Sequence, residues 1–529
     1  MTRLFALALA CFIGVLAVPA IAAADEAEPL FDPAAVAEID FVLPLASLQK
    51  LEEEPETSEY QHAEITVKAG GQTYNLADVG FRLKGGHGSF RDLSAKAAFK
   101  VKFKEFGGPK LLGLKKLTLN NMVQDPSMVH ETMVYELFRE MGVPAPRTGY
   151  AFVRINGEPY GVYLNVETYD DVMLPRFFPS TQHLYEADAP GVDVRPGEAD
   201  TFEVDEGDDE DLSDLEALIA AAADTVGDWS DGMEAVADLD EMTQMWAIGR
   251  YAGHWDGYAG TAAPFRPNNY YLHSLNDGIF AMLPWGTDQT WEVNMEFDEP
   301  AGGLLFNNCV ADAGCEALYE AQLGQVASAI PGLDLDRVAI CTADLLAPWQ
   351  EEEDPLRAEY DAAEIEEGVA DARSFMAQRP AELATFLGAE PPTGVPDGTD
   401  PCPKPDEPEE TDKPTEPPVL IPPPGPPSPV LHFGATKLKG RTVFTRVEIP
   451  AAGTVTQKVT ARIDGRRVQV CSDTGTRAAA VVKVHCQLSK AAQEERADGP
   501  LKLRVRVGFD PEQGRATFRT RTLTAPKHG

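Results

Sequence analysis

The sequence predicts an α+β body, a proline-rich acidic linker and a small all-β sandwich, in that order along the chain. Three observations lead to this prediction. In the body, strand patterns come first, helical patterns follow, and two further strands come last. A later stretch is too rich in proline to pack a core, and short alternating runs resume after it. With 529 residues the chain is too long for a single core. We place the body at residues 30–389, the linker at 390–429 and the sandwich at 430–529.

The early body carries the clearest strand signals. Residues 63–85 alternate polar and apolar side chains around glycines, as expected of a hairpin meander. Residues 99–103, FKVKF, alternate apolar and basic side chains as a half-buried strand does. Residues 151–167 are predicted to form a hairpin that turns at Asn156-Gly157, because Asn-Gly pairs favour tight hairpin turns.

Helices and a last pair of strands complete the predicted body. Residues 128–142 have apolar side chains at helical spacing, with Ser127 as the expected N-cap and Gly142 as the stop. A long helical stretch ends in residues 238–256, and two short strands with a turn between them then lead to Asp288. Strands, then helices, then two strands that carry acids favour an α+β enzyme.

The remainder of the chain is a linker and a second folded unit. Proline and acidic residues dominate residues 390–429, so this linker is expected to be extended. Short alternating runs with turns between them predict a β-sandwich over residues 430–529. The runs are at residues 441–449, 454–463, 468–471, 480–484, 501–507 and 516–523.

Charge is unevenly distributed along the chain. The formal net charge is −40, yet from Val430 onward there are 19 Lys and Arg against 8 Asp and Glu, a net +11 that leaves −51 for the first 429 residues. Such an acidic body repels nucleic acid and anionic lipid and favours divalent cations. The sequence leaves two partners open for the basic sandwich: an external acidic polymer, or the acidic body of the same chain.

The N-terminus predicts a secretory signal peptide over residues 1–24. Arg3 precedes an apolar run at residues 4–18, and Ala22-Ala23-Ala24 supplies small residues for cleavage. This run is short for a membrane span of ~20 residues, and no later segment is apolar for long enough. We therefore expect a secreted or extracytoplasmic protein without a transmembrane segment.

Six cysteines follow the predicted signal peptide, and an even number in an exported chain indicates disulfides. No CxxC pair is present, and no His pair lies near the cysteines, so a zinc site is not expected. Proximity along the sequence favours the pairs Cys309–Cys315, Cys341–Cys402 and Cys471–Cys486. Only Cys471–Cys486 is isolated in a domain of its own.

Four segments occur in the order of a known family pattern. They are RLKGGHGSF with KAAFKVKF; LLGLKKLTLNNMVQDPSMVHETMVYELFREMG; INGEPYGVYLNVE; and HWDGYAG with NNYYL and LPWGTD. On these segments the chain resembles the CotH family of extracytoplasmic atypical kinases, which transfer phosphate from ATP to Ser residues. The resemblance covers roughly residues 41–291 and implies an atypical protein-kinase-like body that uses ATP and Mg²⁺ on a protein substrate with Ser or Thr.

Basic residues in the acidic body are candidates for phosphate binding, because phosphoryl transfer requires cations at the phosphates. Lys84, Lys96, Lys100 and Lys102 lie in the first matched segment, and Lys100 and Lys102 share one face of a predicted strand. Free backbone N–H groups of the Gly85–Gly88 turn could also bind a phosphate group. The alternative is that these lysines pair with surface acids. Trp285 is a candidate for stacking on adenine, with burial in the core as its alternative.

The last matched segment holds the predicted catalytic and metal-binding residues. An Asp and an Asn in one loop, followed by an Asp after the next strand, is the order of a kinase catalytic loop and metal site. By resemblance Asp256 is the catalytic base. Asn268 or Asn269 is then a metal ligand, and Asp288 is the main Mg²⁺ ligand. The alternative places Asp256 and the Asn pair in structural turns.

One position departs from the family pattern. The Trp-Asp-x-Asp turn reads Trp285-Gly286-Thr287-Asp288 in this chain, so the first acid is missing. Two functions therefore stay open. One is an exported Ser/Thr kinase that acts on a surface or extracellular protein, and the other is a catalytically degenerate pseudokinase that serves as a cell-surface binding or adhesive protein.

Overall fold

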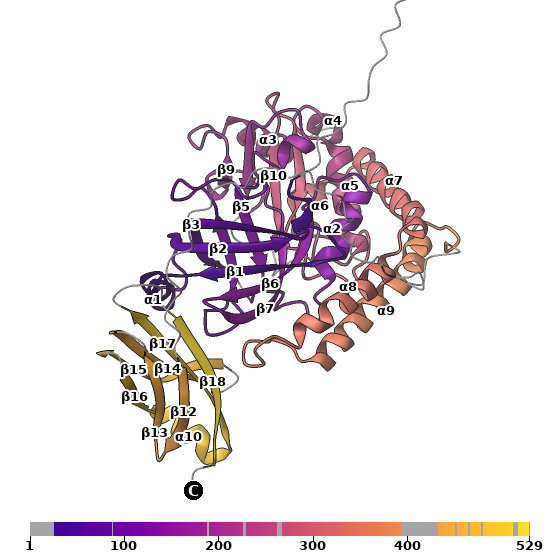
Figure 1. Cartoon of the computed structure of the whole chain (residues 1–529). Helices are drawn as coiled ribbons and strands as arrows, with labels where there is room; N and C mark the ends of the chain where they lie inside the picture. Colours follow the sequence, from indigo (N-terminus) through magenta and orange to yellow (C-terminus); the bar gives the residue numbers. More distant parts are fainter. Residues whose placement is uncertain are drawn as a thin grey trace, which may run out of the picture.

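The computed structural model mixes helices with several sheets, and its C-terminal part is built almost entirely of strands (Figure 1). This agrees with the predicted α+β body and all-β C-terminal region. The predicted signal peptide and nearly all of the predicted linker lie outside the described residues. The described residues are 26–86, 88–187, 190–225, 229–261, 267–392, 402, 432–449, 452–463, 466–477, 480–511 and 517–527.

Seven strands in the first part of the body close into a barrel in the order β1-β2-β3-β4-β5-β7-β6. Neighbouring strands are antiparallel except β1 and β6, which run parallel. Alternate side chains point inward and form one apolar core. The bounds are β1 Val36–Val42, β2 Gln61–Ala69, β3 Gln72–Lys84, β4 Ala98–Lys102, β5 Lys116–Asn120, β6 Thr148–Ile155 and β7 Glu158–Val166, with helix α1 at Leu45–Glu53.

The predicted hairpin at residues 151–167 is confirmed as β6, β7 and the turn between them. Asn156 and Gly157 both have positive φ, 52° and 79°, which is the backbone that a tight primed turn requires. The Asn156 side chain also accepts a hydrogen bond from Leu43 N at 2.8 Å and donates one to Leu43 O at 3.1 Å. The turn is thereby fixed to the end of β1.

A four-stranded sheet in the order β11-β10-β8-β9, together with helices, forms the rest of the body around a larger apolar core. The helix predicted at residues 128–142 is α2, and the strands predicted before Asp288 are β10 and β11. The bounds are α2 His130–Glu140, β8 His183–Glu186, β9 Glu203–Glu206, α3 Ser213–Ala223, α4 Trp229–Met233, α5 Leu239–Tyr251, β10 Tyr270–Ser274, β11 Phe280–Pro284, α6 Leu304–Ala311, α7 Ala313–Ala329, α8 Leu335–Gln350 and α9 Ala362–Phe386.

The start of α2 differs from the prediction that Ser127 is its N-cap. The N-cap residue is Val129, without a side-chain cap. Asp125 instead accepts hydrogen bonds from Met128 N at 3.0 Å and His130 N at 2.9 Å, and from the Ser127 hydroxyl at 2.5 Å. A carboxylate is a stronger acceptor for backbone N–H groups than a hydroxyl, so Asp125 takes this position.

The C-terminal module is a sandwich of two sheets, β12-β13-β16 and β15-β14-β17-β18. Its other strands match the predicted runs, whereas no prediction covered strand β12 or helix α10. The disulfide Cys471–Cys486 joins β15 to β16 and so connects the two sheets. The bounds are β12 His432–Lys439, β13 Thr442–Ile449, β14 Gly453–Ile463, β15 Arg466–Arg477, β16 Ala480–Gln487, α10 Lys490–Asp498, β17 Leu501–Pro511 and β18 Thr517–Ala525.

The three disulfides join cysteines that are consecutive pairs in the sequence: Cys309–Cys315, Cys341–Cys402 and Cys471–Cys486. The pairing expected from the sequence is thus the pairing in the structure, and it is compatible with an oxidising compartment. Among the helices in the described part of the chain, none combines the length and apolar character that crossing a membrane requires.

Candidate active site

The predicted catalytic Asp256 lies beside both predicted Asn residues. The loop after α5 presents its partly buried carboxylate, whose Oδ2 accepts hydrogen bonds from Asn268 Nδ2 at 3.3 Å and Asn269 Nδ2 at 3.0 Å. Burial raises the pKa of Asp256, and the two amides partly oppose this shift. The structure therefore brings these three predicted residues together, with Asp256 as the acceptor at their centre.

The turn that carries Asp288 packs against Asn269. Asn269 adopts a left-handed backbone with φ of 54°, and its carbonyl accepts a hydrogen bond from Trp285 N at 3.2 Å. Gly286 also has positive φ, 51°, and a Cβ added there would lie 2.4 Å from Asn269 Oδ1. The Asn269 side chain thus occupies the space that a side chain at position 286 would need.

His254 links the Asp256 loop to this turn, and it was not among the predicted site residues. Its Nε2 lies 3.3 Å from the carbonyl oxygen of Gly286. Burial lowers the pKa of His254 to about 4, so the imidazole is neutral near pH 7 and donates from Nε2 to that carbonyl. His254 therefore fixes the distance between Asp256, two residues later, and the turn.

Asp288 lies in a strongly acidic environment. Burial is the main cause that raises its pKa well above the usual range, and Glu131, Asp125 and Asp256 add to the shift. Its backbone carbonyl lies 2.9 Å from His130 Nδ1, which holds the residue against the start of α2. A bound cation would relieve the mutual repulsion of these carboxylates.

A chain of three side chains leads from β3 to α2. Lys84 Nζ donates to Asn120 Oδ1, and Asn120 Nδ2 donates to Glu131 Oε2 at 2.8 Å. Desolvation lowers the pKa of Lys84 to about 8, while burial raises the pKa of Glu131 to about 7. Glu131 Oε1 is buried without a hydrogen-bond partner among the described residues. Through Asn120, Lys84 is thus linked to Glu131, whose charge helps to raise the pKa of Asp288.

The other predicted lysines differ in their surroundings. Lys100 pairs in register with Arg82, so it lies on the same face of the barrel wall as Lys84, and it also lowers the pKa of Lys84. Lys102 is 43% exposed and forms an ion pair with Glu105 at 2.9 Å. Lys102 therefore fits the alternative that these lysines pair with surface acids, whereas Lys84 and Lys100 remain candidates for binding phosphate. His87 of the glycine-rich turn lies outside the described residues.

Trp285 is partly buried and belongs to a small aromatic group. Its ring lies 5.9 Å from that of Tyr169 and 5.6 Å from that of Tyr271, between ring centroids. Tyr169 is fixed in turn by hydrogen bonds from its hydroxyl to Pro144 O at 3.1 Å and Pro284 O at 3.0 Å. Core packing accounts for these contacts, and stacking on adenine stays a prediction.

The donor atoms suit a phosphate-bound Mg²⁺ better than a metal held by protein alone. Within the described ranges, no group of three or more His, Cys, Asp or Glu side chains could hold a metal ion. Mg²⁺ in nucleotide sites needs fewer protein ligands, because it keeps waters and takes phosphate oxygens beside one or two carboxylates. The Asp288 carboxylate fits this requirement. Asn269 Oδ1 is a second oxygen, since its Nδ2 faces Asp256.

Sequence reasoning missed Asn120, Glu131 and His254. His254 had a signal, because it stands two residues before Asp256 in the matched segment HWDGYAG. Glu131 lies in a helix and is only 3% exposed, although acids in helices usually face solvent. Nothing in the local pattern separates it from the surface acids of the body.

Comparison with known proteins finds one family model, described as "CotH kinase protein", which matches residues 81–323. An inner spore coat protein H-like protein of Bacillus subtilis (strain 168) is 38% identical over 79 residues, which are 15% of this chain and 24% of that protein. Inner spore coat protein H of the same strain is 26% identical over 228 residues, 40% of this chain and 59% of that protein. The chain therefore spans less than two thirds of either relative.

Proposed function

Since the chain belongs to the CotH family through residues 81–323, we propose that its body is an atypical protein kinase. It would transfer the terminal phosphate of ATP to a Ser or Thr hydroxyl of a surface or extracellular protein. The observation that carries the proposal is the joint placement of Asp256, the Asn pair and the Asp288 turn, with Lys84 linked through Asn120 to Glu131.

Asp256 would act on the acceptor hydroxyl. Its raised pKa makes the carboxylate a better proton acceptor than an exposed aspartate, and the two amide hydrogen bonds fix its orientation. An acceptor Ser or Thr that donates to Asp256 would be aligned for attack and would lose its proton to this carboxylate. Positioning of this kind, together with electrostatic stabilisation of the transferred phosphate, supplies most of the catalysis in phosphoryl transfer.

Lys84 and Asp288 would serve the nucleotide. Mg²⁺, when bound with ATP, would neutralise phosphate charge, and Asp288 with Asn269 Oδ1 would hold it. Lys84 has a lowered pKa because it is desolvated, and a phosphate oxygen would compensate that loss of hydration. The link from Lys84 through Asn120 to Glu131 would keep the ammonium pointed toward the phosphates.

Gly286 supports the alternative, a degenerate pseudokinase that serves as a binding protein. The missing acid removes one potential metal ligand, and the Asn269 side chain takes up the space beside it. We also propose that the chain is exported, since its three disulfides need an oxidising compartment to persist.

Incubation of the purified chain with ATP labelled on its γ-phosphate, in the presence of Mg²⁺, tests the proposal. The kinase predicts Mg²⁺-dependent label on the chain itself or on added Ser-containing protein. A preparation that binds ATP with Mg²⁺ but transfers no label would favour the pseudokinase. Absence of both binding and transfer would refute a nucleotide function altogether.

A further inference from the structure

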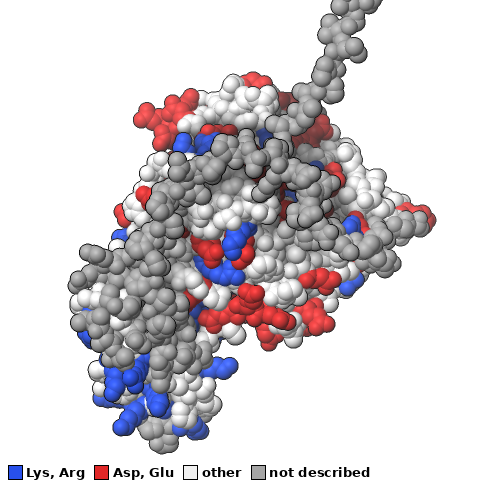
Figure 2. Space-filling model, in the orientation of Figure 1, with Lys and Arg blue, Asp and Glu red and all other residues white. Residues whose placement is uncertain are grey.

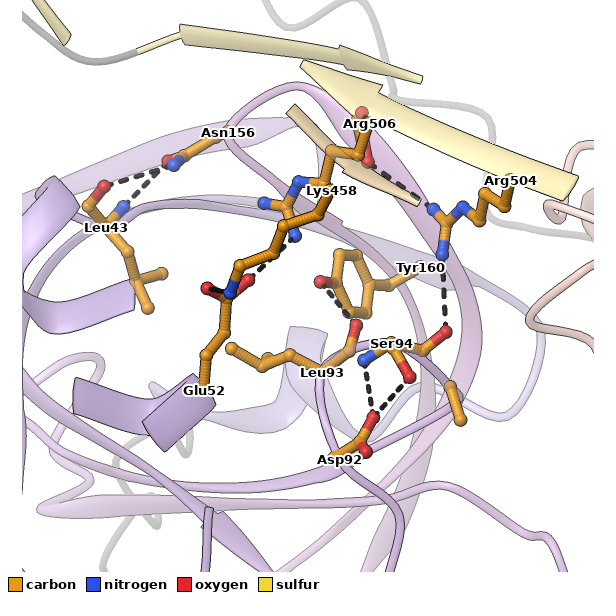
Figure 3. Close-up of polar contacts among 12 residues, drawn as sticks. Leu43, Glu52, Asp92, Leu93, Ser94, Asn156, Tyr160, Lys458, Arg504 and Arg506 are labelled. Atoms are coloured by element: carbon orange, nitrogen blue, oxygen red, sulfur yellow. Dashed lines mark hydrogen bonds and ion pairs between the residues drawn. The ribbon is translucent and has the colours of Figure 1, made fainter. Parts of the chain in front are cut away.

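Two cations of the C-terminal module share one acid of the body (Figure 3). Lys458 of β14 and Arg506 of β17 lie opposite each other in the sheet register, so their side chains leave the same face. Lys458 Nζ contacts the carboxylate of Glu52, near the end of α1, and Arg506 Nη1 lies 3.7 Å from the same carboxylate. This face of the larger sheet is therefore turned toward the body.

Arg504, on the same face of β17, is the most deeply enclosed of the three cations. Its side chain is only 6% exposed and contacts Asp354 at 2.8 Å and Glu158 at 3.5 Å. Arg357 of the body lies 3.5 Å from the same Glu158 oxygen. Burial, followed by the charge of Arg357, lowers the pKa of Arg504 to about 9. A guanidinium so desolvated is tolerated only while its acidic partners are present.

The charges of the two parts complement each other beyond these contacts. Lys and Arg gather on the lower left of the view in Figure 2, where Figure 1 places the module, and Asp and Glu gather along the lower edge of the body. The region from Val430 onward carries +11 and the preceding 429 residues carry −51. The body thus offers the polyanionic partner that the basic sandwich predicts.

The same contact reaches the loop between the glycine-rich turn and β4. Arg504 Nη1 donates to Ser94 O at 3.3 Å, and Arg357 Nη1 donates to Leu93 O at 2.6 Å. At the end of this loop, fully buried Lys96 forms an ion pair with Glu353 at 2.8 Å. The loop is therefore fastened from the segment between α8 and α9 and, independently, from the module.

We propose that the module is a built-in partner of the body, docked through Lys458, Arg504 and Arg506, and that docking restrains residues 88–96. Arg504 is the link between the two effects, because it pairs with body acids and also binds the Ser94 carbonyl. Docking does not require the body to be a kinase, so it stands apart from the proposed function. Binding of an external acidic polymer stays a prediction, and such a polymer would compete with the body for this face.

Hydrogen–deuterium exchange of the full chain tests the restraint. The backbone N–H groups of Phe90, Ser94 and Ala95 report on it, because each is hydrogen-bonded to a group at residues 86–92. In Arg504→Glu their exchange is expected to be about tenfold faster or more, since the reversed charge repels the body acids. Lys483→Glu, the same charge reversal at an exposed residue of β16, is the matched control and should exchange as wild type.

Exchange within β14 and β17 shows whether the module of the variant is folded. If these strands stay protected and residues 90–95 exchange at the wild-type rate, the restraint is refuted. If Arg504→Glu unfolds the module, Arg504→Gln, which removes the charge alone, is judged by the same criterion.

Small-angle X-ray scattering tests docking itself. Reversing all three cations, with Lys458→Glu, Arg504→Glu and Arg506→Glu, should increase the radius of gyration of the full chain at low salt. Adding Glu52→Arg to this triple variant restores two of the opposite-charge contacts and should bring the radius back toward wild type. An unchanged radius in the triple variant would overturn docking.

Discussion

Asn269 holds the carboxylate of Asp256 through a hydrogen bond of 3.0 Å from its Nδ2 to Asp256 Oδ2. Because this end of the amide faces Asp256, the Oδ1 end lies next to Gly286. A single side chain therefore links the predicted catalytic base to the turn that carries the predicted metal ligand. The glycine at position 286 is a requirement of this arrangement, since a Cβ there would overlap with the amide.

The fit between Gly286 and Asn269 predicts that Gly286→Ala destabilises the protein more than Gly278→Ala. Both glycines have positive φ, but a Cβ at Gly278 would meet nothing within 4 Å. The extra overlap at position 286 should lower the free energy of unfolding by a further amount of about 1–3 kcal/mol. Denaturant unfolding of both variants measures the difference, and equal losses would show that Asn269 can move aside.

Asp288→Asn is expected to abolish Mg²⁺-dependent ATP binding while the fold persists. The carboxylate is the predicted metal ligand, and its removal also reduces the repulsion from Glu131 and Asp125. Titration calorimetry with ATP and Mg²⁺ measures the binding. Asp277→Asn, at an exposed acid of the β10–β11 turn, should bind as wild type. Wild-type affinity in Asp288→Asn would remove this residue from the nucleotide site.

The buried carboxyl group of Glu241 is expected to lower the free energy of unfolding as the pH rises. Burial raises its pKa to about 8, although Met282 N donates to its Oε2 at 2.9 Å. Above pH 4.5, the unfolded-state pKa, the folded state retains a proton on Glu241 that the unfolded state has lost. The contribution of Glu241 to the free energy of unfolding is therefore fully present below pH 4.5 and is lost as the pH rises toward 8. Glu131, with a pKa of about 7, acts in the same direction.

Glu241→Gln isolates this contribution, because the amide oxygen can still accept from Met282 N. Between pH 5 and pH 8 the variant should lose about 3–4 kcal/mol less unfolding free energy than wild type. Chemical unfolding at the two pH values measures this. Parallel losses in both proteins would mean that Glu241 is ionised in the folded state.

The sequence predicted local features better than those that depend on packing. The Asn156-Gly157 turn was predictable because a two-residue loop sets its own backbone. Asp256 and Asn269 were predictable as neighbours, since they lie 13 residues apart in the sequence and the resemblance placed them in one loop. The pairing of Tyr270 with Pro284 then brings the next turn alongside. These are relationships within about 30 residues of chain.

Features that depend on distant packing were not predictable. From the sequence, Glu131 is indistinguishable from an exposed acid on a helix. Only the folded structure shows that it contacts Asn120, at the end of β5. Lys100 and Lys102 share a strand face by alternation, but only the position of Glu105 decides that Lys102 is paired. Charge asymmetry suggested a partner for the C-terminal module, and the acids it contacts come from three separated places in the body.

Phosphate transfer by Asp256→Ala, compared with wild type, tests the central claim most directly. The substitution removes the predicted proton acceptor and leaves Lys84 and Asp288 in place. ATP binding should persist while the rate of label transfer from γ-labelled ATP falls by a factor of about 100 or more. Transfer at the wild-type rate in Asp256→Ala, or no Mg²⁺-dependent transfer by the wild-type chain, would contradict the account.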